Sequence, residues 1–436
     1  MIRKNGKDLD CNKVIHNRKA LVLIESSAGD LDWIIPVIKY LIDKNLHIEI
    51  VYLTKMAKDS VKDNFFLSDY LGRYPQIKCF EVGWIMRKIR AINFILYRIR
   101  LKTKNKILGY CLNIICNTLA VIFIRISIVR DNIGKENFIF SGHVELRSPR
   151  NFRAHLERVF KNSIFFYYPN GSGLYTRKLE TDCINNKVRH KCRSYVMLGS
   201  PCDFEVLKKS VNYNIEGVVP IYTGHPKYSD KWISSFKKNS YNSTMEDRKK
   251  GVKILIISRI PGAYLDKEVC ESLASTTMKV LHEKFSNYQV IVKKHPREFN
   301  SYWDTLAEQY SSIIFSEDSV SKAAAKVDFS IAFFSTASID CFIMGTPVIE
   351  FLNPKKLKIV DFDGKNKMDT LCRALKVVLP ANNESELRVA IDKIVSKSYK
   401  ASLESSHSFF QNVVNQSNQW DLDFNFFLNT NNIYLE

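Results

Sequence analysis

The sequence contains, at residues 20–53, the stretch ALVLIESSAGDLDWIIPVIKYLIDKNLHIEIVYL. It opens with a short apolar run and a turn of small residues, and then places apolar residues at helical spacing from Trp33 to Leu41. A second apolar run, His47–Leu53, is typical of a strand. A strand, a helix and a strand in this order form a βαβ unit, whose two strands are parallel. The stretch therefore predicts an α/β fold.

The same alternation of strand and helix patterns continues along the rest of the chain. We expect further strands at Asn137–Ser141, Ser163–Tyr168, Ser194–Leu198, Lys253–Ser258, Tyr288–Lys293, Ser312–Phe315, Phe329–Phe333 and Pro347–Phe351. A polar stretch, Lys237–Gly251, divides this series into two. The sequence therefore predicts two doubly wound, Rossmann-like domains that face a central cleft. Their expected bounds are 1–222 and 251–400, with a linker at 223–250 and a tail at 401–436 that packs back on the protein.

Two well-known phosphate-binding signatures are absent from this α/β pattern. The chain has neither Gly-x-Gly-x-x-Gly nor the Gly-x-x-x-x-Gly-Lys-Ser/Thr loop. The turn Asn170-Gly171-Ser172-Gly173 is too short and irregular to be the first of them. Dinucleotide-dependent dehydrogenases and P-loop enzymes are therefore disfavoured.

The composition excludes several classes of protein. Hydrophobic residues make up 45% of the 436, which is typical of globular rather than disordered chains. The ten cysteines form no Cys-x-x-Cys pair and have no histidine at zinc-ligand spacing. The first twenty residues lack the apolar region of a secretory signal. We expect reduced thiols, no metal and a cytoplasmic location.

The net charge of +20, from 65 basic and 45 acidic residues, is concentrated in one segment. Ten basic residues and no acidic ones lie between Val82 and Arg130. Apolar residues of this segment recur at one helix face, namely Ile85, Ile89, Ile92, Leu96 and Ile99. An amphipathic basic helix at residues 82–130 suits an anionic membrane surface, and a solvated face packed on the core is the alternative. The uncharged run Ile107–Ile124 is interpreted as a buried helix followed by a strand at Leu119–Val129, in preference to a membrane span.

A basic turn, Lys293-Lys294-His295-Pro296-Arg297, follows the second strand of the second domain. Ligands bind at the carboxyl ends of strands in open parallel sheets. Two lysines, a histidine and an arginine at that edge would attract a phosphate group. A basic surface turn without function is the alternative.

Hydroxyl side chains follow another strand of the same domain. Ser335, Thr336 and Ser338 come directly after Phe329–Phe333 and before a helix pattern. Hydroxyls and amides at the start of a helix can bind phosphate, although they can also serve only as a helix cap. Glu350, at the end of the next strand, is a candidate for hydrogen bonding to a nucleoside. The alternative is that it is a solvated residue at a strand end without a role in binding.

These motifs, together with Gly345-Thr346-Pro347 and Thr223–Asp230, resemble the nucleotide-binding half of GT-B glycosyltransferases. The resemblance is nearest to the group of bacterial capsule polysialyltransferases, Kdo transferases and CDP-glycerol glycerophosphotransferases. It implies that His295, Ser335 and Thr336 hold the phosphate of a cytidine nucleotide. It also implies that the N-terminal domain binds the acceptor and supplies a base.

The candidates for this base lie after the strands of the first domain. Asp30 and Asp32 follow the first strand, where either could take a proton from an acceptor hydroxyl, although Asp30 could instead cap the helix. His143 and Glu145, which follow the strand ending at Ser141, are rivals. The glycines of Asn170-Gly171-Ser172-Gly173 allow close approach of the backbone, so this turn is a candidate for acceptor binding.

The expected activity is transfer of a sugar or polyol phosphate from a CMP-sugar, such as Kdo or sialic acid, or from a CDP-polyol. The acceptor would be a hydroxyl of a bacterial surface polysaccharide or glycolipid, at the inner face of the cytoplasmic membrane. We expect no cofactor beyond the nucleotide-activated co-substrate. A UDP-sugar-dependent GT-B transferase and a sugar-nucleotide epimerase are the alternatives. A nucleic-acid-binding protein is less favoured, because no motif of such a module accompanies the basic segment.

Overall fold

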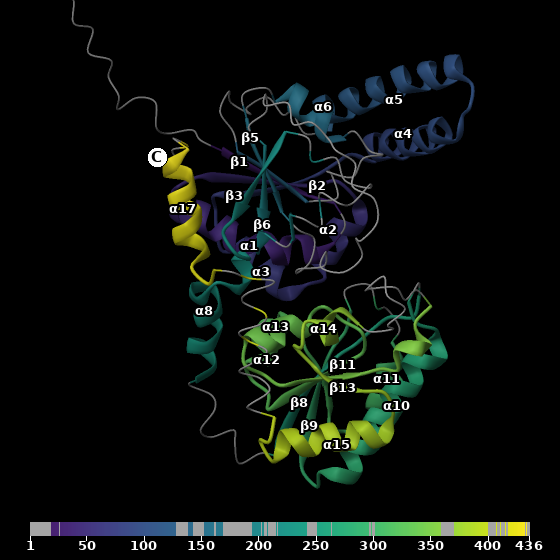
Figure 1. The fold of residues 1–436 in the computed structure, drawn as a ribbon, viewed down its shortest axis with the longest axis vertical. Helices are drawn as coiled ribbons and strands as arrows, with labels where there is room; N and C mark the ends of the chain where they lie inside the picture. The colour runs from purple at the N-terminus through teal and green to yellow at the C-terminus, as the bar shows by residue number, and fades with distance from the viewer. Residues whose placement is uncertain are drawn as a thin grey trace, which may run out of the picture.

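The computed structural model describes residues 19–25, 27–127, 138–142, 152–160, 163–168, 194–201, 203–204, 207, 215, 217–241, 251–262, 264–295, 298, 301–358, 370–399, 407, 410, 415, 417–431 and 433. Within them the chain forms two parallel sheets, each covered by helices, which lie one above the other in Figure 1. This confirms the predicted α/β architecture with two doubly wound domains.

The N-terminal sheet has seven strands in the order β3-β2-β1-β4-β5-β6-β7. Their bounds are β1 Lys19–Ile24, β2 His47–Tyr52, β3 Ile77–Glu81, β4 Phe138–Gly142, β5 Ile164–Tyr168, β6 Ser194–Leu198 and β7 Val218–Tyr222. Helices α1 (Ala28–Asp43), α2 (Lys55–Lys62), α3 (Phe65–Gly72) and α6 (Phe152–Val159) belong to the same domain. Each pair of neighbouring strands is parallel.

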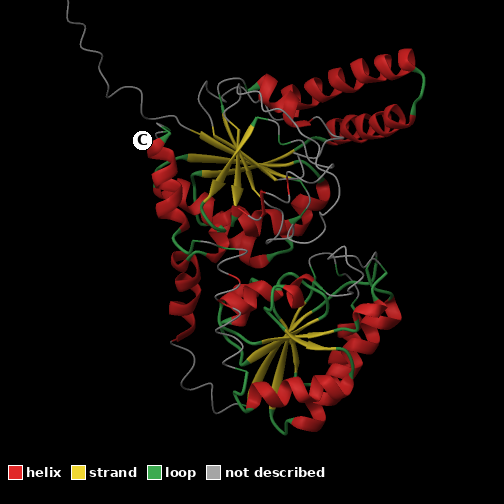
Figure 2. Cartoon of the chain, in the orientation of Figure 1, coloured by secondary structure: helices red, strands yellow, loops and turns green. Residues whose placement is uncertain are grey.

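The C-terminal sheet repeats this layout with six parallel strands in the order β10-β9-β8-β11-β12-β13. The strands are β8 Val252–Ile257, β9 Tyr288–Lys293, β10 Ile313–Phe315, β11 Phe329–Ala332, β12 Val348–Phe351 and β13 Leu379–Ala381. The helices are α10 Lys267–Lys284, α11 Tyr302–Gln309, α12 Val320–Ala324, α13 Ser338–Ile343, α14 Leu371–Ala374 and α15 Glu384–Val395, with the short turn η6 at Pro354–Lys356. Figure 2 shows helices on both sides of each sheet.

The strand order places a switch point in each sheet. In the N-terminal sheet, β2 and β3 are added on one side of β1, and β4 is then added on the other side of β1. In the C-terminal sheet, β9 and β10 lie on one side of β8, and β11 lies on the other. A crevice opens at the carboxyl ends of the strands on either side of such a point, because the two connections leave in opposite directions. Both switch points are therefore the expected places for a ligand.

Continuous burial explains why the central strands are uniformly apolar. The β4 and β5 strands are buried along their whole length, and β1 is buried from Ala20 onward. Packed apolar clusters cover both faces of each sheet, so inner strands have no solvent-facing side. The edge strand β3 is instead largely exposed, which explains why it lacks the apolar pattern that marks the other strands.

Two antiparallel helices, α4 (Trp84–Lys102) and α5 (Lys106–Ser127), form a hairpin that projects from the N-terminal domain (Figure 1). The predicted strand at Leu119–Val129 is wrong, because α5 continues as a helix to Ser127. Leu112, Cys116 and Ala120 recur every four residues and are buried. This helical spacing outweighs the local preference of the β-branched residues for a strand.

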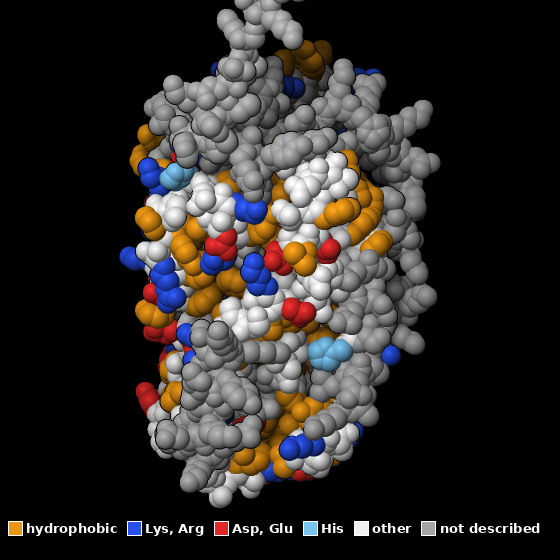
Figure 3. All heavy atoms as spheres, turned by 90° about the vertical axis from the view of Figure 1, so that its left-hand side faces the viewer, with side chains coloured by type: hydrophobic (Ala, Val, Ile, Leu, Met, Phe, Trp, Pro, Cys, Tyr) orange, Lys and Arg blue, Asp and Glu red, His pale blue; other side chains and the backbone are white. Residues whose placement is uncertain are grey.

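Two segments lie at the junction of the domains: the connection that follows β7, and the C-terminal tail, which packs back against it. The chain leaves β7 through the short turn η4 (Pro226–Tyr228) and helix α8 (Asp230–Tyr241), which occupies part of the segment expected to be a linker. Helix α17 (Trp420–Thr430) returns to the N-terminal domain, where Trp420 and Phe424 join its apolar core. Figure 3 shows the side of the molecule that is on the left in Figure 1, where charged side chains of both signs lie among apolar ones.

Gly224 makes the contact between junction and tail possible. Its φ is +72°, and a Cβ at this position would lie 2.2 Å from the carbonyl oxygen of Ser417. Beside it, the backbone N–H of His225 donates to Asn415 Oδ1 at 2.6 Å. A side chain at residue 224 would therefore displace the tail from the junction.

Candidate active site

A cavity of about 290 Å³ lies between the two domains. Its walls come from the residues after β1, from the turn η4, and from the residues after β8, β9 and β11. It thus joins the switch points of the two sheets, as expected for a ligand site in this architecture. The wall from the N-terminal domain includes Asp30 and Asp32, and the wall from the C-terminal domain includes Lys293, His295 and Thr336.

The turn that carries His295 is held by a carboxylate behind it. The backbone N–H of His295 donates to Glu298 Oε2 at 3.0 Å, and the N–H of Glu298 donates back to the His295 carbonyl at 2.8 Å. Glu298 Oε1 accepts from Ser258 Oγ at 3.0 Å, and the indole N–H of Trp303 donates to the same Ser258 oxygen at 2.9 Å. Glu298 therefore fixes the backbone of the turn through hydrogen bonds to the main chain of His295.

The two lysines of the basic turn have different surroundings. Lys294 Nζ lies 2.5 Å from Asp304 Oδ1 and 4.2 Å from the centre of the Phe315 ring. Lys293 is half-buried, and this burial lowers its pKa, while Asp32 across the cavity and nearby acidic residues oppose the shift. Lys293 is consequently the lysine whose charge is coupled to the opposite wall of the cavity.

The hydroxyl motif after β11 is divided between the cavity and the core. Ser335 and Thr336 line the cavity, and Ser335 Oγ accepts from the N–H of Ala337 at 3.3 Å. Phe334, just before them, has a φ of +56°, so the chain turns sharply at the end of the strand. Ser338 is fully buried and is not among the residues that line the cavity.

Glu350 lies apart from this cavity. Its carboxylate accepts from Arg373 Nε at 2.8 Å and from Thr370 Oγ1 at 2.5 Å, and its side chain is 1% exposed. Arg373 also donates to the carbonyl oxygens of Glu350 and Leu352. The structure thus gives Glu350 a buried ion pair that joins β12 to α14, and not a place in the cavity wall.

Ser27 caps helix α1, accepting a hydrogen bond from the N–H of Gly29 at 3.2 Å. The interpretation of Asp30 as the helix cap is therefore wrong. Asp30 is buried in the first turn of α1, and both it and Asp32, which follows in the next turn, line the cavity. The positive end of the helix favours a negative charge at Asp30.

A buried lysine joins the two walls of the cavity. Lys227 of η4 is ion-paired with Asp32 of the N-terminal domain and with Asp340 of α13, whose Oδ1 lies at 2.9 Å. Below, these three residues are called the Lys227 triad. The side chains of Lys227 and Asp340 are 11% and 7% exposed and are shielded from water, whereas Asp32 is 28% exposed on the side of the cavity.

Charge and burial act in opposite directions within the Lys227 triad. Burial disfavours the charged lysine, but the carboxylates of Asp32 and Asp340 outweigh it and raise the pKa of Lys227. Burial raises the pKa of Asp340 to about 6, although Lys227 opposes this shift. The lysine therefore keeps its charge, and Asp340 is the carboxylate of the triad whose pKa burial raises.

Several of the predicted site residues cannot be compared with the structure. His143, Glu145, Asn170, Gly171, Ser172, Gly173, Pro296 and Arg297 lie outside the described residues. The sequence motifs include Lys227, Asp340 and Glu298, but no role in the site was predicted for them or for Ser258. Glu298 directly follows the predicted basic turn, and this position next to a phosphate-binding motif could have indicated its role in the site. The partners of Lys227 lie 195 and 113 residues away in the sequence, and no local pattern indicates that they would pair with it.

Within the described part of the chain, no three His, Cys, Asp or Glu residues are grouped to hold a metal ion.

Comparisons with known proteins support the fold. No protein-family model and no curated protein matches the chain. Among solved structures, the wall teichoic acid polymerase TagF, soaked with CDPG, matches with a TM-score of 0.51 and 12% identity, over 94% of this chain and 88% of that chain. A UDP-GlcNAc 2-epimerase from Methanocaldococcus jannaschii matches with a TM-score of 0.48 and 11% identity, over 87% and 92% of the two chains. A glycosyltransferase from Rickettsia africae gives 0.46 and 13%, over 95% and 98%. The match to the polymerase shows that the chain has the two-domain α/β fold of GT-B type.

Proposed function

We propose that this protein is a glycosyltransferase that moves a sugar or polyol phosphate from a cytidine-nucleotide-activated donor to an acceptor hydroxyl. The donor would be a CMP-sugar or a CDP-polyol, and the acceptor a bacterial surface polysaccharide or glycolipid. The observation that carries the proposal is the cavity itself. One wall offers His295, Lys293 and the Ser335-Thr336 hydroxyls to an anion, and the opposite wall offers carboxylates to a hydroxyl.

This arrangement fits the chemistry of transfer from a nucleotide. The acceptor oxygen forms a bond to the donor carbon, or to phosphorus in the case of a polyol phosphate, while the bond to the nucleotide phosphate oxygen breaks. The leaving nucleotide gains negative charge, which Lys293 and His295 stabilise from a preorganised, partly buried position. The acceptor hydroxyl loses its proton to a carboxylate on the opposite wall. We propose that none of these steps needs a metal ion.

We assign the role of base to Asp30. Both Asp30 and Asp32 line the cavity, but Asp32 Oδ2 is engaged by the ammonium of Lys227. Asp32 thereby holds the lysine in place. Asp30 lies buried in the first turn of α1 and lines the cavity, and we propose that its carboxylate accepts the proton.

The choice of a cytidine donor rests on two observations. The Lys-x-His-Pro and Ser-Thr motifs resemble those of transferases that use cytidine nucleotides, and the TagF structure of the same fold type was soaked with CDPG. A UDP-sugar donor or epimerisation of a sugar nucleotide would use the same two-domain layout. Product analysis separates these outcomes, because an epimerase converts the donor alone and a transferase requires an acceptor.

Thermal melting in the presence of nucleotides tests the donor site. CMP or CDP at a hundredfold excess over the dissociation constant should stabilise the protein by about 2.7 kcal/mol, because it binds only the folded state. UDP and GDP at the same concentration should give a smaller rise in Tm. The rise with CMP or CDP should be unchanged in EDTA. Stabilisation by UDP but not by CMP or CDP would contradict the cytidine assignment, and loss of the effect in EDTA would contradict metal independence.

Replacing Asp30 by asparagine tests the base. The variant should lose about 10²- to 10⁴-fold in kcat, because the amide cannot accept the acceptor proton, while its nucleotide affinity stays unchanged. Asp43→Asn, at the other end of α1, serves as the control and should keep normal turnover. If Asp30→Asn retains the kcat of the unmodified protein, the base is another residue, and His143 and Glu145 would be tested next.

A further inference from the structure

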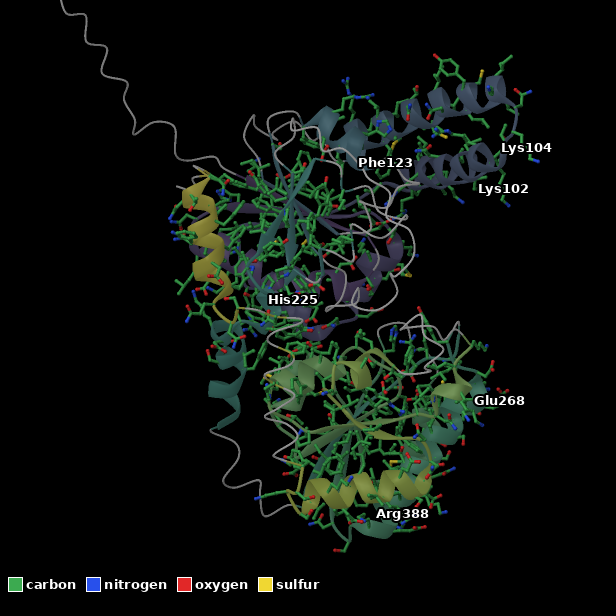
Figure 4. The ribbon with its side chains drawn as sticks, viewed as in Figure 1. Lys102, Lys104, Phe123, His225, Glu268 and Arg388 are labelled. Carbon is green, nitrogen blue, oxygen red and sulfur yellow. The ribbon has the colours of Figure 1, made fainter. Side chains whose placement is uncertain are left out.

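The helical hairpin of α4 and α5 stands apart from the two domains. Figure 4 places Lys102 and Lys104 at the outer end of the hairpin and Phe123 near its base. The base is fixed to the domain by ion pairs, since Arg90 lies 2.7 Å from Glu25 and Arg87 pairs with Glu81. The hairpin is therefore a firmly attached projection whose outer surface remains to be explained.

Helix α5 has two faces of opposite environment. Its inner face packs on α4 and on the domain, and carries the buried residues Leu112, Cys116, Ala120, Phe123 and Ile124. Its outer face is apolar and exposed, and carries Ile107, Leu108, Ile114, Ile115, Ile122 and Ile126, which are 37–78% exposed. The most apolar 18-residue window within Lys106–Ile126 has a mean hydropathy of 2.1, yet only 28% of that window is buried. Large exposed apolar surfaces of this kind mark sites of interaction.

The charges around this outer face all have the same sign. No acidic residue lies between Val82 and Arg130. Lys102, Lys104 and Lys106 at the outer end and Arg125 near the base are exposed, and none of them forms an ion pair with another described residue. An apolar strip bordered by basic side chains matches a lipid surface whose headgroups carry phosphate and net negative charge.

We infer that the outer face of α5 docks on an anionic lipid bilayer. The apolar side chains of the strip enter the boundary between headgroups and acyl chains, and the lysines at the outer end contact lipid phosphates. The sequence pattern indicates α4 as the lipid-facing helix, and in the structure α4 keeps Ile85, Ile92 and Ile99 exposed but half-buries Ile89 and Leu96. Helix α5 exposes more large apolar side chains and is the more apolar of the two, so we place the docking surface there.

Helix α5 is long and apolar enough to cross a membrane, but its partner argues against this. Helix α4 runs antiparallel beside it and carries six basic residues, which are Arg87, Lys88, Arg90, Arg98, Arg100 and Lys102. Each basic residue costs about 2.5–3.5 kcal/mol at the centre of a bilayer. Because Cys116 and its neighbours on α5 are packed on α4, the hairpin would have to enter as a unit. Docking on the surface avoids that cost.

Charge also argues against a second copy of this chain as the occupant. Two hairpins placed face to face would bring two clusters of lysines together with no acidic residue from either segment to offset them. An anionic membrane supplies the missing charge. A bilayer is therefore the occupant that both the apolar strip and its basic border favour.

Flotation with lipid vesicles tests this inference. The full-length protein should float with vesicles of phosphatidylcholine mixed with phosphatidylglycerol, and less with phosphatidylcholine alone or at high salt. Ile114→Ser/Ile115→Ser on the outer face of α5 should lower binding about tenfold or more, because apolar area no longer enters the lipid. Ile92→Ser/Ile95→Ser, a similarly exposed pair on α4, is the matched control and should bind normally.

A second set of variants separates charge from apolar contact. Lys102→Gln/Lys104→Gln/Lys106→Gln should weaken binding to the anionic vesicles roughly a hundredfold. Lys355→Gln/Lys356→Gln/Lys393→Gln removes the same charge from the C-terminal domain and should bind normally. Circular dichroism and melting temperature should show that every variant is folded, since all of these side chains are exposed.

Several results would overturn the inference. Equal binding to both kinds of vesicle would exclude a headgroup-dependent surface, and equal loss for the α4 and α5 pairs would exclude docking through the outer face of α5. Retention in the membrane after an alkaline carbonate wash would indicate a spanning hairpin. Self-association that is lost in Ile114→Ser/Ile115→Ser, without any binding to vesicles, would show that the face binds a second copy.

Discussion

Replacing His295 by alanine should lower kcat by about 10²- to 10³-fold and leave the folded protein intact. This is the loss typical of removing one preorganised donor from a developing negative charge. The backbone of the turn is held by hydrogen bonds between His295 and Glu298 at 3.0 and 2.8 Å, which use the backbone N–H and carbonyl of His295. Removing the side chain therefore removes the phosphate donor and leaves these two hydrogen bonds in place.

Release of the nucleotide from a donor and acceptor pair measures this effect. His47→Ala, at the exposed start of β2, is the control and should retain normal turnover. His295→Gln keeps a neutral donor at this position and should recover part of the lost rate. Near-normal kcat in His295→Ala would show that the nucleotide phosphate binds elsewhere.

The central strands of both sheets could be predicted because burial on both faces forces them to be apolar. Tyr288–Lys293 is found at the predicted bounds, and Phe329–Phe333 within one residue of them. The strands β3, β7 and β13 were not predicted. They are edge strands, where partial exposure relaxes the apolar pattern, and of the four edge strands only β10 was predicted. The sequence pattern reports burial, and an edge strand is held mainly by backbone hydrogen bonds that the sequence does not show.

In the candidate site, too, some residues could be predicted from the sequence and others could not. The His295 turn and the Ser335-Thr336 pair could be proposed because each follows a recognisable strand, and the structure brings both to one cavity. The same reasoning placed Glu350 there, but a strand end fixes only the edge of the sheet and not the direction of the side chain. Glu350 instead forms an ion pair with Arg373. Interactions between segments distant in sequence, such as the Lys227 triad, depend on how the two domains face each other.

Replacing Lys227 by methionine should destabilise the protein by about 3–5 kcal/mol at pH 8. Removing one partner of a buried ion pair leaves the other charge without compensation, and here two carboxylates would face each other. Asp340 and Asp32 are 7% and 28% exposed, so Asp340 bears most of this effect. Urea unfolding measures the change. Lys231→Met breaks the pair with Asp421, where the lysine is 70% exposed, and should cost about 0.5 kcal/mol or less.

The loss in Lys227→Met should depend on pH in a direction that the structure defines. Burial already raises the pKa of Asp340 to about 6, with Lys227 opposing it, so removing the lysine raises this pKa further. A carboxyl whose pKa is higher in the folded state contributes stability at low pH and loses it as the pH rises through that pKa. The variant should therefore be closer in stability to the unmodified protein at pH 5 than at pH 8. A loss of equal size at both values would contradict this origin.

A second substitution identifies the cause of the instability. If the charge on Asp340 destabilises Lys227→Met, then Lys227→Met/Asp340→Asn should recover much of the lost stability at pH 8 and remove most of the pH dependence. If the loss instead came from misfit of the methionine, the second substitution would recover nothing. The triad bridges the two walls of the cavity, so the double variant should also separate its two roles. A stable double variant with a lowered kcat would show that Lys227 and Asp340 hold the acceptor and donor walls in register as well as stabilising the fold.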